Sequence, residues 1–256
     1  MWIRRSLVRD QEVVPFPSLI SQRPHGVFDP QLRAENGKIR LCGRPWFAER
    51  RGRSGQVCSA MSRVIVHDSI HDELVDRMVG VANSLSLKPG IDQAEFGPTM
   101  GAMVSEAQRD RAVGKICAAQ EEGARIAAGG HKANIPGAFL EPTVLTDVLP
   151  EMSIAQEEVF GPVVSVLKFS TDGEAIQIAN GTPFGLVGGV FTRDLDRATS
   201  AARQLRAGQV FVNEWYAGGV ETPFGGFGKS GYGREKGREA LWNYVQTKNV
   251  AIKLQG

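Results

Sequence analysis

Residues Val163–Asn213 read VVSVLKFSTDGEAIQIANGTPFGLVGGVFTRDLDRATSAARQLRAGQVFVN, and this stretch decides the fold class. It predicts a strand at Val163–Phe169, a helix at Asp172–Asn180, a strand at Gly185–Thr192, a helix from the capping Asp194 to Arg206, and a strand at Gln209–Asn213. Strands that alternate with helices of this size form a parallel sheet covered on both faces. We therefore predict an α/β fold built on a parallel sheet with helices on both faces.

The chain on either side of this stretch continues the same pattern. We expect strands at Val64–Val66, Arg125–Ala128 and near Thr143–Leu145, helices from Asp68 or Ser69 to about Leu85, from about Ser105 to Glu122 and at about Lys236–Tyr244, and a last strand at Lys248–Leu254. In the second of these helices we place Cys117 on the buried stripe with Val113 and Ile116. Cys117 is therefore predicted to be a packing residue.

Composition excludes several classes of protein. The chain has 256 residues, a net charge of +2 and three cysteines. A charge this near neutral argues against nucleic acid as a partner, and no apolar run is long enough to span a membrane. Few cysteines in odd number indicate a reducing compartment, so we expect a cytoplasmic protein. No spacing of Cys and His resembles a metal site.

Residues 1–54 differ from the rest of the chain. They hold ten arginines and five prolines and show no sustained periodicity of either helix or strand. We predict that 1–54 is an irregular, basic and disordered leader.

Cys58 lies in the segment Ser54–Arg63, SGQVCSAMSR. The small residues Ser59 and Ala60 follow it, which leaves room for a substrate carbonyl to approach the sulfur. An isolated cysteine is more often a small buried residue than a nucleophile, so this segment alone is weak evidence.

Two later segments change that weighting. They are QEEVFGPVV (Gln156–Val164) and TPFGGFGKSGYGRE (Thr222–Glu235). Together with GQVC, in this order and spacing, they resemble the aldehyde dehydrogenase superfamily, and the match runs from about Gly55 to about Leu254. The resemblance covers the family's C-terminal half, its catalytic domain and its terminal oligomerisation strand.

The resemblance implies a role for each matching residue. Cys58 would be the catalytic nucleophile, and its backbone N–H one donor to the oxyanion. Glu158 would bind the nicotinamide-side ribose of NAD or NADP, and Phe160 would pack near the nicotinamide. Trp215, Tyr216 and Phe224 would line the pocket for a small-molecule aldehyde. We expect the catalytic domain at 55–240 and the oligomerisation strand at 241–256.

The family's N-terminal cofactor domain has no counterpart that we find in residues 1–54. There is no ELGGK-like run, in which the family carries its general-base glutamate. We expect a truncated aldehyde dehydrogenase that is inactive or weak by itself. Two alternatives stay open: a cofactor-free thiol esterase, and a non-enzymatic fragment that pairs with a full-length homologue. The terminal strand also predicts that copies of this chain associate into a homo-oligomer.

Overall fold

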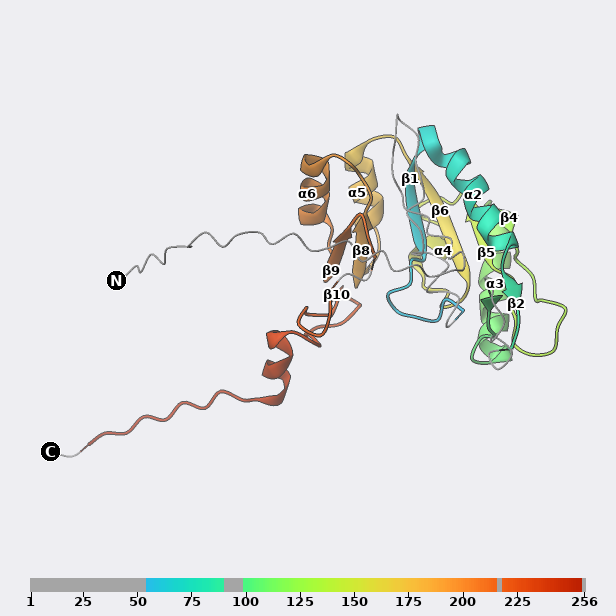
Figure 1. The fold of residues 1–256 in the computed structure, drawn as a ribbon. Helices are drawn as coiled ribbons and strands as arrows, with labels where there is room; N and C mark the ends of the chain where they lie inside the picture. The colour runs from blue at the N-terminus through green and yellow to red at the C-terminus, as the bar shows by residue number, and fades with distance from the viewer. Residues whose placement is uncertain (1–53, 90–98, 216–217, 255–256) are drawn as a thin grey trace, which may run out of the picture.

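The structure is a computed structural model, which describes residues 54–89, 99–215 and 218–254 (Figure 1). Its elements are β1 (Arg63–His67), η1 (Asp68–Ile70), α2 (His71–Asn83), β2 (Ser86–Leu87), β3 (Thr99–Met100), α3 (Glu106–Glu121), β4 (Arg125–Ala128), β5 (Thr143–Thr146), α4 (Ser153–Gln156), β6 (Val163–Phe169), α5 (Asp172–Asn180), β7 (Phe184–Gly185), β8 (Val187–Val190), α6 (Leu195–Gln204), β9 (Gln209–Val212), β10 (Phe227–Gly228) and η3 (Arg238–Tyr244). Residues 1–53 lie outside the described residues, so the predicted disorder of the leader is not tested there.

A four-stranded sheet in the order β1-β6-β5-β4 forms the centre of the fold. β6 pairs in parallel with β1 on one side and with β5 on the other. The predicted parallel α/β sheet is therefore present. β4 differs, because it pairs antiparallel with β5 after a turn. This edge strand makes the sheet mixed, whereas β1, β6 and β5 are parallel.

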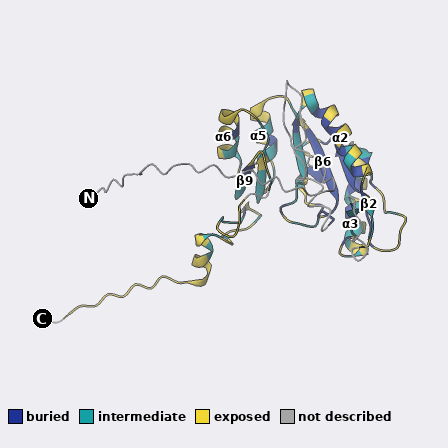
Figure 2. Ribbon diagram, in the orientation of Figure 1, coloured by how far each residue is buried: buried dark blue, intermediate teal, exposed yellow. Residues whose placement is uncertain are grey.

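Helices cover both faces of this sheet, as predicted (Figure 2). Along β6, residues with even numbers pack toward α2, in a cluster that holds Met78, Val164 and Val166. The alternate residues Val163 and Leu167 pack on the opposite face with α3, α4 and α5. Successive strand side chains point to opposite faces, so a strand buried on both faces needs the continuous apolar run that β6 has.

The buried stripe of α3 consists of Ala112, Ile116 and Ala119, each fully buried. Cys117 is exposed, so the prediction that it packs in the core was wrong. Neighbouring helix residues are about 100° apart around the axis, and this step from Ile116 carries Cys117 away from Ala112 and Ala119.

A second unit of parallel strands follows in the chain. β8 and β9 pair over four residues, and α6 packs against both. The cap of α6 is the predicted one, because the Asp194 carboxylate accepts the N–H of Arg197 at 3.0 Å.

The C-terminal segment extends away from the sheet (Figure 1). Where a helix was predicted at about Lys236–Tyr244, the structure has a 3-10 helix, η3, and none of its residues is buried. The predicted strand Lys248–Leu254 has no strand partner in the described chain and is exposed throughout. A 3-10 helix has poorer hydrogen-bond geometry than an α-helix, and neither it nor the following segment is covered by packing here.

Candidate active site

Parallel pairing brings two of the sequence motifs to the same end of the sheet, where β1 and β6 begin. The Cys58 segment precedes β1, and the segment with Glu158 precedes β6. Arg63 is in register with Ser165, and the Ser165 N–H donates to the carbonyl of Ser62 at 3.0 Å. Segments about a hundred residues apart are therefore neighbours, which sequence spacing alone does not establish.

Three side-chain hydrogen bonds hold the segment on the N-terminal side of Cys58. The Ser54 hydroxyl donates to the carbonyl of Gly101 at 2.6 Å and lies 3.2 Å from that of Ala102. The Gln56 amide oxygen accepts the N–H of Val104 at 2.9 Å. Ser54 is only 1% exposed, so it belongs to the fold and not to the leader in which we had placed it.

Cys58 itself lies in a tight turn. The N–H of Ala60 donates to the carbonyl of Val57 at 2.9 Å, and this bond closes the turn around Cys58 and Ser59. The Cys58 side chain is exposed, whereas Ser59 is buried. The turn thus presents the thiol outward and anchors the residue after it.

The segment with Glu158 and Phe160 is held by α3. The Gln108 side-chain amide donates to the carbonyls of Val159 at 3.1 Å and of Phe160 at 3.2 Å. Phe160 has a φ of 53°, and its ring stays 37% exposed. Such a backbone conformation is uncommon for a bulky residue and persists only where the surroundings fix it. Glu158 is exposed beside it.

Gly161 completes this turn because its neighbours leave little room for a side chain. A Cβ at Gly161 would lie 3.1 Å from Met103 Cε and 3.5 Å from Ala112 Cβ. Residues 101–108, which we call the bridging segment, therefore contact both Ser54 and Gln56, just before the Cys58 turn, and the Glu158 segment. One short piece of chain fixes both motifs.

A charged contact adds to this support. The Lys115 ammonium of α3 pairs with the Glu157 carboxylate and donates a hydrogen bond to it. This hydrogen bond holds the pKa of Glu157 below its usual value. Glu157 is thus held by α3, as are Val159 and Phe160.

The three predicted pocket residues lie in different surroundings. Trp215 reaches the Cys58 turn, because its indole N–H donates to the carbonyl of Ser59 at 3.1 Å. Tyr216 lies outside the described residues. Phe224 pairs through its backbone with Glu235, and the Lys236 ammonium lies 5.6 Å from the centre of its ring. Trp215 thus contacts the Cys58 turn. The contacts described for Phe224 are with Glu235 and Lys236 instead.

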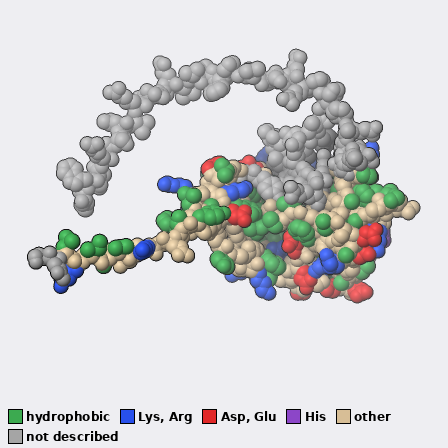
Figure 3. All heavy atoms as spheres, turned by 90° about the horizontal axis from the view of Figure 1, so that it is seen from below, with side chains coloured by type: hydrophobic (Ala, Val, Ile, Leu, Met, Phe, Trp, Pro, Cys, Tyr) green, Lys and Arg blue, Asp and Glu red, His purple; other side chains and the backbone are tan. Residues whose placement is uncertain are grey.

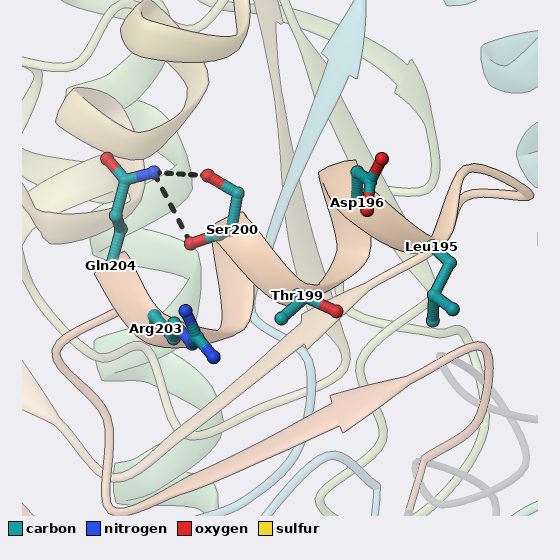
Figure 4. A pocket seen from close by; sticks show the side chains of 6 residues that line it. All are labelled: Leu195, Asp196, Thr199, Ser200, Arg203 and Gln204. Atoms are coloured by element: carbon teal, nitrogen blue, oxygen red, sulfur yellow. Dashed lines mark hydrogen bonds between the residues drawn. The ribbon is translucent and has the colours of Figure 1, made fainter.

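A hollow on the surface has none of these residues in its lining (Figure 4). It is lined by Leu195, Asp196, Thr199, Ser200, Arg203 and Gln204, all of them on or beside α6. The Gln204 amide already donates to the hydroxyl of Ser200 at 2.9 Å. We assign no role to this hollow, because it adjoins none of the chemistry-bearing motifs.

Two further classes of site find no support in the part of the chain that is described. Among residues 54–89, 99–215 and 218–254, no cluster of His, Cys, Asp and Glu could hold a metal ion. Within the same ranges, no helix is both long and apolar enough to cross a bilayer.

Sequence reasoning missed the residues that support the motifs. Gln56, Ser54 and Gln108 act on carbonyl or N–H groups about 50 residues away in the chain. Gln56 stands directly in the GQVC motif, so its amide was the one available signal. Ser54 and Gln108 carry no pattern that distinguishes them from other surface polar residues.

Comparison with known proteins identifies the class. The model of the aldehyde dehydrogenase family matches residues 46–250. Aldehyde dehydrogenase tropH from Talaromyces stipitatus is 43% identical over 210 residues, which cover 79% of this chain and 40% of that protein. Cytosolic aldehyde dehydrogenase 1 from Rattus norvegicus is 42% identical over 200 residues, 78% of this chain and 39% of that one.

Solved structures agree. The NAD+ complex of an aldehyde dehydrogenase from Bacillus cereus superposes with a TM-score of 0.75 at 41% identity, and covers 79% of this chain and 40% of that chain. The protein belongs to the aldehyde dehydrogenase family. It spans about 40% of the length of the relatives that it matches, and its family match begins at residue 46, inside the segment that we had assigned to a leader.

Proposed function

We propose that this chain carries the catalytic half of an aldehyde dehydrogenase, which oxidises an aldehyde to a carboxylic acid with Cys58 as the nucleophile. The observation that supports this most is the shared anchoring of two motifs. The Cys58 turn and the Glu158–Phe160 segment precede the paired strands β1 and β6, and the bridging segment contacts Gln56, just before the turn, as well as residues 159–161. An enzyme that joins a covalent intermediate to a redox cofactor needs these two parts at a fixed separation.

Cys58 has the setting of a thiol that meets an external substrate. The side chain is exposed, and the buried Ser59 next to it keeps the turn in place. As a thiolate, the Cys58 sulfur would attack the aldehyde carbon to give a thiohemiacetal. The Cys58 N–H would donate to the oxyanion that forms. Loss of hydride then leaves a thioester, which water hydrolyses to the acid.

The residues at the Glu158 turn fit one end of a nicotinamide dinucleotide. Each oxygen of an exposed carboxylate can accept a hydroxyl hydrogen, which suits the two hydroxyls of a ribose. Phe160 offers a partly exposed ring face two residues away, on a backbone fixed by Gln108. NAD or NADP would supply the hydride acceptor here. The NAD+ complex of the Bacillus cereus relative supports NAD.

The remaining assignments follow from the same family membership. We propose 55–240 as the catalytic domain, with Trp215, Tyr216 and Phe224 in the wall of the aldehyde pocket. Residues 241–256 are proposed as an association segment, and the cytoplasm as the location, which the cytosolic relative from rat supports.

A second activity has support in the exposure of Cys58. Ester cleavage through a thiol needs a nucleophile and an oxyanion donor but no redox cofactor. The Cys58 turn provides both groups within the described chain. We therefore expect slow, cofactor-free cleavage of an activated ester.

Release of p-nitrophenolate from p-nitrophenyl acetate tests the nucleophile. We expect the Cys58→Ala variant to lose the fast phase of release, since its side chain cannot accept the acetyl group. The matched control is Cys117→Ala, because Cys117 is also an exposed thiol and lies outside the site. The same fast phase in the Cys58→Ala variant would refute the role of Cys58.

The C-terminal segment should mediate association between chains. Val250, Ile252 and Leu254 are 65%, 78% and 86% exposed, and apolar side chains line the segment in Figure 3. In an extended chain these alternate residues point the same way, and an unpaired strand of this kind recruits a partner strand.

Ile252→Gln should weaken association, whereas Lys253→Gln, which changes the opposite side of the strand, should leave it intact. The measurement is molar mass by light scattering over a range of concentrations. A chain that stays monomeric at high concentration, or two variants that behave alike, would contradict this assignment.

A further inference from the structure

Trp215 makes a contact that a simple pocket-wall residue does not need. Its indole N–H donates to the carbonyl of Ser59 at 3.1 Å, across 156 positions of sequence. The ring packs against Phe211, at 5.8 Å between centres, and over Gly189 of β8. A Cβ at Gly189 would lie 2.8 Å from Trp215 Cε3, so glycine is what lets the ring lie there.

The carbonyl that Trp215 contacts belongs to a chain of peptide groups that ends at Cys58. The same peptide unit carries the N–H of Ala60, which donates to the carbonyl of Val57 at 2.9 Å. The next unit, between Val57 and Cys58, carries the Cys58 N–H. A peptide unit is planar, so the direction of its carbonyl fixes the direction of its N–H.

We propose that Trp215 is a positioning residue, which orients and polarises the Cys58 N–H through these two peptide units. The inference rests on the proposed function of Cys58, because it concerns the donor to the oxyanion. Hydrogen bonds in a chain polarise one another, so the indole donor strengthens the Ala60 bond and with it the donor at Cys58. Trp215 touches neither the sulfur nor the reacting carbon in this role.

Two reactions of the same thiol separate this role from general support of the fold. In acylation by p-nitrophenyl acetate, the thiolate forms an S–C bond to the carbonyl carbon, and an oxyanion develops. The carbonyl then re-forms as the C–O bond to p-nitrophenolate breaks. In alkylation by iodoacetamide, the thiolate displaces iodide from a saturated carbon, and no oxyanion forms. A weaker Cys58 N–H donor slows the first reaction alone.

The test is the Trp215→Phe variant, which keeps a ring over Gly189 and removes the indole donor. We expect Cys58 acylation to slow about tenfold, a part of the 10²–10³ that loss of a whole oxyanion donor costs. Cys58 alkylation, measured by peptide mass mapping, should be unchanged. Trp242→Phe is the control, since Trp242 is 73% exposed on η3.

A second variant keeps the indole and moves it. Gly189→Ala places a methyl group where the Trp215 ring lies, so it should also slow acylation and spare alkylation. Equal loss of both reactions in the two variants, or loss of neither, would overturn the inference. If the wild-type chain shows no acylation that depends on Cys58, the proposed function and this inference both fail. If the wild type is acylated at Cys58 and the variants match its rate, only this inference fails.

Discussion

The 256-residue polypeptide, assayed by itself, should form no NADH at a rate typical of its family with any aldehyde. The sequence holds no ELGGK-like run to supply the general base, and a missing base costs a factor of about 10²–10⁴. In the family that the sequence resembles, a second oxyanion donor is an asparagine side chain of the cofactor domain, for which we find no counterpart in residues 1–54, and lack of such a donor costs on the order of 10²–10³ in rate. In the roles proposed for them, Glu158 and Phe160 would contact a small part of a dinucleotide, so most of its binding free energy has to come from other contacts.

The measurement is absorbance of NADH at saturating cofactor with aliphatic, aromatic and amino-aldehydes. Cys58→Ser serves as the blank, because it keeps the shape of the site without the thiolate. Turnover near 1 s⁻¹ that depends on Cys58, within the usual range for enzymes, would show that residues 1–54 supply parts we have not identified.

Replacing Leu145 with alanine should lower the free energy of unfolding by about 2–5 kcal/mol. Leu145 is fully buried in β5, between β4 and β6, and it packs in the core cluster shared by α3, α4 and α5. The substitution removes apolar burial and leaves a cavity in a part of the sheet held on both sides, which restricts collapse around it.

Urea unfolding followed by circular dichroism measures this loss. The matched control is Leu195→Ala, the same chemical change at a side chain that is 78% exposed. It should stay within about 0.5 kcal/mol of wild type. Equal effects of the two substitutions would mean that β5 does not lie in the core.

The sequence predicts the sheet centre well because local and global signals agree there. β6 and α5 have the bounds expected from the sequence. A continuous apolar run reports burial on both faces, and Thr171 caps α5 by accepting the N–H of Glu174. The direction of β4 was not predictable in the same way. It depends on the path of residues 129–142, which connect β4 to β5, and on strand pairing, and strand composition does not encode these.

The errors in burial have a similar origin. Cys117 was placed on a stripe with Val113 and Ile116, whereas in the structure the buried stripe is Ala112, Ile116 and Ala119. His71, at the start of α2, is 2% exposed, with Nε2 3.1 Å from the hydroxyl of Thr146. A small alanine stripe and a hydrogen-bonded buried histidine are both weak signals in a hydrophobicity pattern.

The candidate site, too, could be predicted from the sequence only in part. Cys58, Glu158 and Phe160 were proposed from the sequence because each stands in a motif of contiguous residues. The residues that hold them, such as Gln108 and the indole N–H of Trp215, act across long separations in the chain. The parallel register of β1 and β6 places the Cys58 and Glu158 segments at the same end of the sheet.

The role of Cys58 is tested most directly by finding where an acetyl group attaches. The full chain is treated briefly with p-nitrophenyl acetate, digested, and mapped by mass spectrometry. We predict acetylation of the peptide that contains Cys58, with the exposed Cys117 left free. Acetyl groups distributed equally over Cys58 and Cys117, or found on Cys117 alone, would contradict the assignment of Cys58 as the nucleophile.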